Sequence, residues 1–207
     1  MSDLRPHARE LGTSVEAAEN ELARAAQMNR PSYEQYGIVS VDPGEAHVGM
    51  AVGVGLGFTS EHDELAMSFE TTPAIALRAL HTAITCGWID VLVIEDFRLQ
   101  PDKAMAQTGS DMPTSQMIGA LKWMLIHNAI QTDRMNLPKL IMQPPSLKKT
   151  TASVLKHYGI RAATRGSDHA RDAELHWWYL LLSERGLMPG INPRGLPRLN
   201  DYGSFNG

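Results

Sequence analysis

The chain has 207 residues, 43% of them hydrophobic, and a formal net charge of −4, which predicts one domain with a full core, carrying extensions. The single cysteine, Cys86, excludes a disulfide framework within the chain and a cysteine-based zinc site, and it suits a reducing compartment such as the cytoplasm. We expect neither a signal peptide nor a membrane-spanning helix, because no long apolar run occurs.

The charge distribution is more informative than the net charge, which by itself argues mildly against nucleic-acid binding. Between residues 148 and 171 the only acidic residue is Asp168. The basic residues there are Lys148, Lys149, Lys156, Arg161, Arg165 and Arg171. A local basic face of this kind is enough to hold a phosphate backbone, although a solvated surface is the alternative interpretation.

The chain begins with a predicted helical arm, residues 1–36, in which Thr13 and Glu16 fit a capping box. Two apolar runs, 38–41 and 48–54, then predict an antiparallel hairpin. Asp42 ends the first run, and Pro43-Gly44 turns the chain directly after it.

Three further strands are indicated by short apolar runs: 67–70, 91–94 and 139–142. The run 91–94 is apolar on both faces and is expected at the centre of a covered, parallel part of the sheet. Four helices are indicated by apolar residues at helical spacing: 72–86, 113–131, 146–158 and a last one from Ser167 or Asp168 to Leu182. The apolar stripe of 113–131 fits either the core or a dimer face.

Early antiparallel strands followed by alternating strands and helices predict an α/β fold with a mixed sheet flanked by helices. The predicted organisation is an arm (1–36), one folded domain (37–186) and a flexible tail (187–207) rich in Pro, Gly and Asn. Residues 97–112 form a long polar segment, and a loop of that length in a compact domain is often functional.

Carboxylates end two of the predicted core strands: Asp42 ends the first, and Glu95 with Asp96 ends the central one. A carboxylate at the tip of a core strand needs a partner, a hydrogen bond or a metal ion. Asp42 could instead cap the Pro43-Gly44 turn, and Glu95 could pair with an arginine.

A third acidic group opens the last helix. His169 and Asp172 are three residues apart and share a helix face, and Asp168 is four residues from Asp172. Each has an ordinary alternative, as a helix cap or as surface residues of the first turn. Together with the strand-end acids, however, they would repel one another unless a cation neutralised them. Oxygen ligands with at most one imidazole suit Mg²⁺ or Mn²⁺, and two such ions roughly 4 Å apart support phosphodiester hydrolysis.

Three motifs resemble those of RuvC-type Holliday junction resolvases, whose fold is ribonuclease-H-like. Val-Ser-Val-Asp-Pro-Gly at 39–44 resembles the first, Val-Leu-Val-Ile-Glu-Asp at 91–96 the second, and Asp-His-Ala-Arg-Asp-Ala at 168–173 the third. They occur in the family's order and span roughly residues 37–182. The compact, divergent form resembles a phage-encoded member.

The resemblance implies a ribonuclease-H-like, mixed five-stranded sheet and a two-metal site with Mg²⁺, for which Mn²⁺ may stand in. The implied catalytic and metal-binding residues are Asp42, Glu95, His169 and Asp172, with Asp168 as an alternate ligand. The implied DNA-binding residues are Phe97, Arg98, Lys103, Gln107, Lys148, Lys149 and Lys156.

The activity implied is that of a crossover junction endodeoxyribonuclease, acting in DNA recombination and repair in the cytoplasm of a bacterium or phage-infected host. Such an enzyme works as a homodimer, here through the helix 113–131, and makes paired nicks in four-way DNA junctions that leave 5′-phosphates. Two alternatives stay open: the same chemistry on flaps, forks or RNA–DNA hybrids, and a non-catalytic protein that binds branched DNA.

Overall fold

The computed structural model describes residue 20 and residues 35–56, 64–96, 113–132, 137–160 and 167–188. Residues 1–34 of the predicted arm (except Asn20), the 97–112 segment and the tail beyond Met188 lie outside the described residues, whereas Gln35 and Tyr36 of the predicted arm belong to the first strand. Met188 is buried against Leu155 of the folded domain. The division into arm, domain and tail stays a prediction.

All five predicted strands and all four helices predicted after the arm are found, with their ends shifted by a few residues. The strands are β1 (Gln35–Pro43), β2 (Val48–Leu56), β3 (Glu64–Thr71), β4 (Val91–Glu95) and β5 (Lys139–Gln143). The helices are α2 (Pro73–Thr85), α4 (Pro113–Thr132), α5 (Leu147–His157) and α6 (Asp168–Glu184). Helices α2 and α5 are followed by Gly87 and Gly159, whose φ values of 70° and 69° lie in the left-handed region that glycine tolerates.

The strands form one sheet in the order β3-β2-β1-β4-β5. Strands β1, β2 and β3 pair antiparallel, whereas β4 pairs parallel with both β1 and β5. The predicted fold class, α/β with a mixed five-stranded sheet flanked by helices, is therefore confirmed. The three mutually parallel strands β1, β4 and β5 end at the same edge of the sheet.

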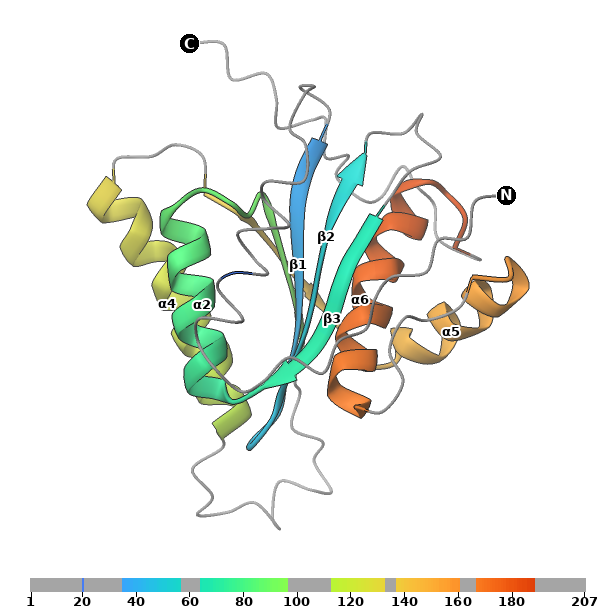
Figure 1. Cartoon of the computed structure of the whole chain (residues 1–207), viewed down its shortest axis with the longest axis horizontal. Coiled ribbons are helices and arrows are strands. Elements are labelled where there is room, and N and C mark those ends of the chain that lie inside the picture. Colours follow the sequence, from blue (N-terminus) through green and yellow to red (C-terminus); the bar gives the residue numbers. More distant parts are fainter. Residues whose placement is uncertain are drawn as a thin grey trace.

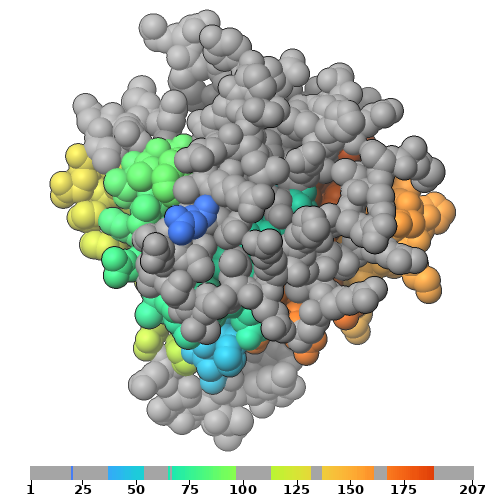
Figure 2. All heavy atoms as spheres, viewed as in Figure 1, coloured from blue at the N-terminus to red at the C-terminus, as the bar shows by residue number. Residues whose placement is uncertain are grey.

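Helices cover both faces of the sheet: α2 and α4 lie on one, and α6 on the other with α5 packed beside it (Figure 1). The space-filling view from the same side has α2 and α4 on one flank and α5 on the opposite flank (Figure 2). Successive side chains of a strand point to opposite faces of the sheet, so β1 contributes to the apolar core on each face. Val39 and Val41 of β1 pack toward α2 and α4, whereas Ile38 packs toward Trp177 of α6.

Helix α4 buries one side and exposes the other. Met117 and Leu121 pack in the core, whereas Trp123, Ile126 and Ile130 are 62%, 60% and 73% exposed. The stripe predicted for this helix lies on the core side, and the three exposed residues form a second, outward apolar side. Among the described helices none is long and apolar enough to cross a membrane.

Candidate metal centre

The strand period of two places the key polar side chains on the α6 face of the sheet. Ile38 of β1 and Val91 of β4 face α6, so Asp42 and Glu95, four residues further along each strand, face it too. The parallel register pairs Val41 with Ile94 and Glu95 with Gln143. Asp42, Glu95 and Gln143 therefore lie side by side at the carboxyl edge of the sheet.

The start of helix α6 is held closely against β2 and β3. Ser167 caps the helix by accepting a hydrogen bond from the Ala170 amide at 3.3 Å, and its hydroxyl also donates to Glu70 at the end of β3. On β2, a Cβ at Gly49 would overlap the carbonyl oxygen of His169. Glycine at this position thus allows the first turn of α6 to approach the strand and brings Asp172 to the site.

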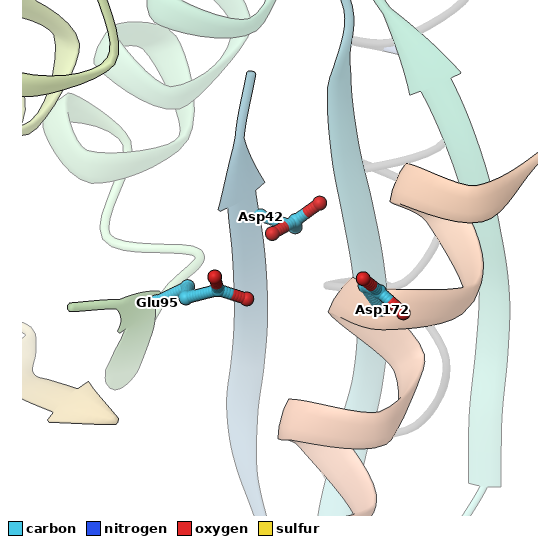
Figure 3. A group of neighbouring side chains, drawn as sticks. All are labelled: Asp42, Glu95 and Asp172. Carbon is cyan, nitrogen blue, oxygen red and sulfur yellow. The ribbon is translucent and has the colours of Figure 1, made fainter. Parts of the chain in front are cut away.

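Three carboxylates meet where these elements converge. Asp42, Glu95 and Asp172 each offer one oxygen, and these oxygens lie within 4.8 Å of one another. Figure 3 shows Asp42 at the end of β1, between Glu95 on the neighbouring strand and Asp172 on α6. We call these three residues the carboxylate cluster. Carboxylates this close repel one another strongly unless protons or cations intervene.

Asp42 is the most buried member, with its side chain 7% exposed. Burial, together with the hydrogen bond and charge of Glu95, raises the pKa of Asp42 to about 7. Nδ1 of His169 lies 2.6 Å from Oδ2 of Asp42 and opposes this rise. Burial beside a second carboxylate therefore favours the protonated form of Asp42 far more than in an exposed aspartate.

Glu95 behaves in the opposite way. Burial alone would raise its pKa, but hydrogen bonds from His176 and Lys148 outweigh burial and lower the pKa of Glu95 to about 2. The Lys148 ammonium lies 2.8 Å from Oε2 of Glu95 and 2.5 Å from Oδ2 of Asp172. Burial would lower the pKa of Lys148, yet its bonds to Asp172 and Glu95 raise that pKa above its ordinary value. Lys148 thus provides a fixed positive charge inside the carboxylate cluster.

The structure brings together three of the predicted metal ligands, places a fourth at their edge and separates the fifth from them. Asp42, Glu95 and Asp172 form the carboxylate cluster, and His169 joins its edge by contacting Asp42. Asp168 is exposed at the first position of α6, outside the cluster. Its place in the first turn fits the alternative interpretation, an acid favoured by the helix dipole.

The predicted DNA-binding residues divide into three groups. Lys148 points into the carboxylate cluster, whereas Lys149 and Lys156 are exposed on α5. The other four lie outside the described residues: Phe97, Arg98, Lys103 and Gln107.

Sequence reasoning missed two residues of the site, His176 and Gln143. His176 is fully buried, and its ring nitrogens contact Glu95 at 2.9 Å and Gln143 at 2.8 Å. A signal was available, because His176 follows Asp172 by four residues and His169 by seven, which places all three on one helix face. Gln143 carried a weaker signal as the last residue of a strand parallel to β4.

The donor set fits a hard divalent cation. Three carboxylates from three elements converge, and the cluster already attracts one ammonium and retains a proton. Carboxylate oxygens are the ligands that Mg²⁺ and Mn²⁺ prefer. The cluster contains no cysteine. The partly exposed imidazole of His169 contacts it through Asp42.

No family model matches the chain, and no curated protein matches it significantly. Among solved structures, the chain is similar to Thermus thermophilus RuvC in complex with a Holliday junction substrate, with 13% identity, a TM-score of 0.42, and 73% of this chain and 97% of that chain covered. It is also similar to the fowlpox virus resolvase in complex with Holliday junction DNA, with 18% identity, a TM-score of 0.45, and 72% of this chain and 97% of that chain covered. A third similar structure is the yeast mitochondrial Holliday junction resolvase Ydc2, with 15% identity, a TM-score of 0.38, and 86% of this chain and 98% of that chain covered. The names of these three structures are those of RuvC and of two other resolvases.

Proposed function

We propose that this protein is a Mg²⁺-dependent, structure-selective DNA endonuclease that resolves four-way junctions by paired phosphodiester hydrolysis. The observation that carries the proposal is the carboxylate cluster. Asp42, Glu95 and Asp172 come from two parallel strands and one helix, and they meet at one edge of the sheet. A ribonuclease-H-like fold with a carboxylate cluster at this edge supports a nuclease more directly than it supports a binding module.

Asp42, Glu95 and Asp172 are the proposed ligands, and His169 completes the set at its edge. Bound Mg²⁺ or Mn²⁺, as one ion or as a pair, would activate water and stabilise the leaving oxygen. In the proposed reaction the water oxygen bonds to phosphorus, the bond from phosphorus to the 3′-oxygen breaks, and a 5′-phosphate and a 3′-hydroxyl result. His169 uses Nδ1 to contact Asp42, which leaves Nε2 free to accept a proton or to coordinate.

Lysine residues of α5 are the proposed contacts to the DNA backbone. Lys148 lies within the carboxylate cluster, where its ammonium would face the reacting phosphate and offset charge that develops there. Lys149 and Lys156 are exposed on the same helix and would bind flanking phosphates. Phe97, Arg98, Lys103 and Gln107 remain proposed contacts from the segment that follows Glu95.

A homodimer is part of the proposal, with α4 as the contact element. Trp123, Ile126 and Ile130 are three and four residues apart, so they form one outward apolar stripe, which we call the α4 face. An apolar helix face with this exposure is typical of an association surface. A second copy is the occupant that fits, because paired nicks on opposite strands need two equivalent sites.

The same cluster would serve flaps, forks or RNA–DNA hybrids equally well, and the described residues favour none of these substrates over the junction. Matched, end-labelled versions of all four substrates, incubated with the protein and Mg²⁺, test the proposal. We expect the four-way junction to be cut fastest, with 5′-phosphates at the nicks. Equal or faster cleavage of another substrate would contradict the substrate class, and binding without any cleavage would favour the non-catalytic alternative.

The proposed setting is recombination and repair in the cytoplasm of a bacterium or a phage-infected host. It rests on the proposed substrate and on a composition with a single, exposed cysteine.

A further inference from the structure

His176 lies deep in the molecule but touches the carboxylate cluster. It is 0% exposed, on the third turn of α6, and packed over the sheet. Nε2 lies 2.9 Å from Oε2 of Glu95, and Nδ1 lies 2.8 Å from Oε1 of Gln143. Since Glu95 and Gln143 are paired in the parallel register of β4 and β5, the imidazole bridges two neighbouring side chains.

The polarity of this bridge follows from what each group can do. Ionised Glu95 can only accept hydrogen bonds, so Nε2 of His176 donates. Nδ1 faces Oε1 of Gln143: a protonated ring donates to that oxygen, whereas a neutral ring accepts from the amide NH₂ once a half-turn exchanges the amide oxygen and nitrogen. In either case Nε2 donates to Glu95, and both ring nitrogens of a fully buried side chain are satisfied.

The contacts on Glu95 are asymmetric. His176 and Lys148 both bind Oε2, at 2.9 Å and 2.8 Å. Two donors on one oxygen restrict rotation of the carboxylate: Lys148 binds it from within the cluster, and His176 binds it from the buried side. A buried histidine whose role is only to pack would need polar partners, but its partner would not have to be a member of the carboxylate cluster.

We infer that His176, anchored by Gln143, is a positioning residue that orients Glu95 for binding a divalent cation. This inference rests on the proposed function, because it assigns Glu95 the role of a ligand. Partners that orient metal ligands from behind commonly change metal affinity by about 10- to 100-fold when they are removed.

Two substitutions at position 176 separate positioning from packing. In His176→Gln the side-chain amide reaches the place of Nε2 and keeps a donor to Glu95, whereas in His176→Asn the shorter amide reaches only the place of Nδ1 and keeps the contact with Gln143. Mg²⁺ affinity is measured by calorimetry, and Tm is measured with and without Mg²⁺. Gln143→Met provides a third variant that keeps the imidazole and removes its anchor.

We expect His176→Asn to weaken Mg²⁺ binding about 10- to 100-fold and to reduce the rise in Tm that Mg²⁺ causes. His176→Gln should retain most of the affinity, and Gln143→Met should lose less than His176→Asn. If His176→Asn lowers Tm equally with and without Mg²⁺ and binds Mg²⁺ like wild type, the role is structural and the inference is wrong. Should both substitutions at 176 prevent folding, wild-type affinity in Gln143→Met would contradict it.

Failure of the proposed function is distinguishable from failure of this inference. If the wild-type protein neither binds Mg²⁺ nor cleaves branched DNA, the nuclease proposal is contradicted and the role of His176 falls with it. If the wild-type protein does both and His176→Asn equals it in affinity, only the positioning role is wrong.

Discussion

Asp42 and Glu95 are neighbouring carboxylates whose pKa values move in opposite directions. Burial and the adjacent Glu95 raise the pKa of Asp42 to about 7. Burial would raise the pKa of Glu95, but hydrogen bonds from His176 and Lys148 lower it to about 2. The pair therefore shares one proton near neutral pH, and that proton belongs mainly to Asp42. A cation that binds the carboxylate cluster has to displace it.

Mg²⁺ affinity should consequently depend on pH around the pKa of Asp42. Above pH 7 the residue is ionised and binding releases no proton from it, whereas below pH 7 each binding event expels one. We expect the apparent affinity to fall by up to about tenfold per unit between pH 7 and pH 6. Calorimetry at pH 6, 7 and 8, in two buffers of different ionisation enthalpy, measures both affinity and proton release. Constant affinity across this range would contradict the displacement of a proton from Asp42 when the cation binds.

Lys148 supplies the positive charge of the carboxylate cluster in the metal-free protein. Lys148→Met should destabilise that form by about 2 kcal/mol, because Glu95 and Asp172 lose a shared donor in a partly buried site. With saturating Mg²⁺ the loss should shrink, since the ion takes over the neutralisation. Urea unfolding with and without Mg²⁺ measures both values. Lys149→Met, on the exposed side of the same helix, is the matched control and should change neither.

The ligands could be predicted from the sequence more fully than their surroundings. Asp42 and Glu95 each end a recognisable strand, and Asp172 lies one turn into a recognisable helix, so their positions follow from local patterns. The contact of Lys148 with Glu95 and Asp172 depends on how α5 packs on α6, which no local pattern specifies. For the same reason Lys148 could be predicted as a phosphate contact but not as part of the carboxylate cluster.

At the scale of elements, the site depends on how closely α6 approaches the sheet. Gly49 on β2 makes this approach possible, because a side chain there would overlap the His169 carbonyl. The Ser167 cap and its contact with Glu70 hold the same helix end against β3. Strands and helices were predictable from residue periodicity, whereas this close packing depends on atoms distant in the sequence.

Gly49→Ala should therefore displace the start of α6 and separate Asp172 from Asp42 and Glu95. We expect a loss of about 2 kcal/mol in the free energy of unfolding, typical of overpacking, and a clear loss of Mg²⁺ affinity. Gly119→Ala in α4 is the matched control, because nothing lies within 4 Å of its added Cβ. It should leave Mg²⁺ affinity unchanged. Wild-type Mg²⁺ affinity in Gly49→Ala would show that the close approach does not position the ligands.

At the scale of the whole molecule, the α4 face lies on the opposite layer from α5 and α6 (Figure 1). If a second copy covers it, Ile126→Glu with Ile130→Glu should give a monomer in sedimentation experiments where wild type is a dimer. The monomer should still fold, because both side chains are more than half exposed. Tyr158→Glu, an exposed position at the end of α5, serves as the control. A wild-type monomer at micromolar concentration, or an intact dimer in the double variant, would contradict the assigned interface.

Cleavage of a labelled four-way junction by the wild-type protein and by Asp42→Asn tests the central claim most directly. Asparagine is neutral like the protonated Asp42, so the variant should fold and bind the junction. Its cleavage should fall by about 10³-fold, as expected when a site loses several kcal/mol of metal-dependent stabilisation. With Mg²⁺, wild type should produce symmetric paired nicks, mapped on all four strands. Wild-type cleavage rates in Asp42→Asn, or no cleavage by folded, Mg²⁺-bound wild type, would contradict the proposed nuclease function.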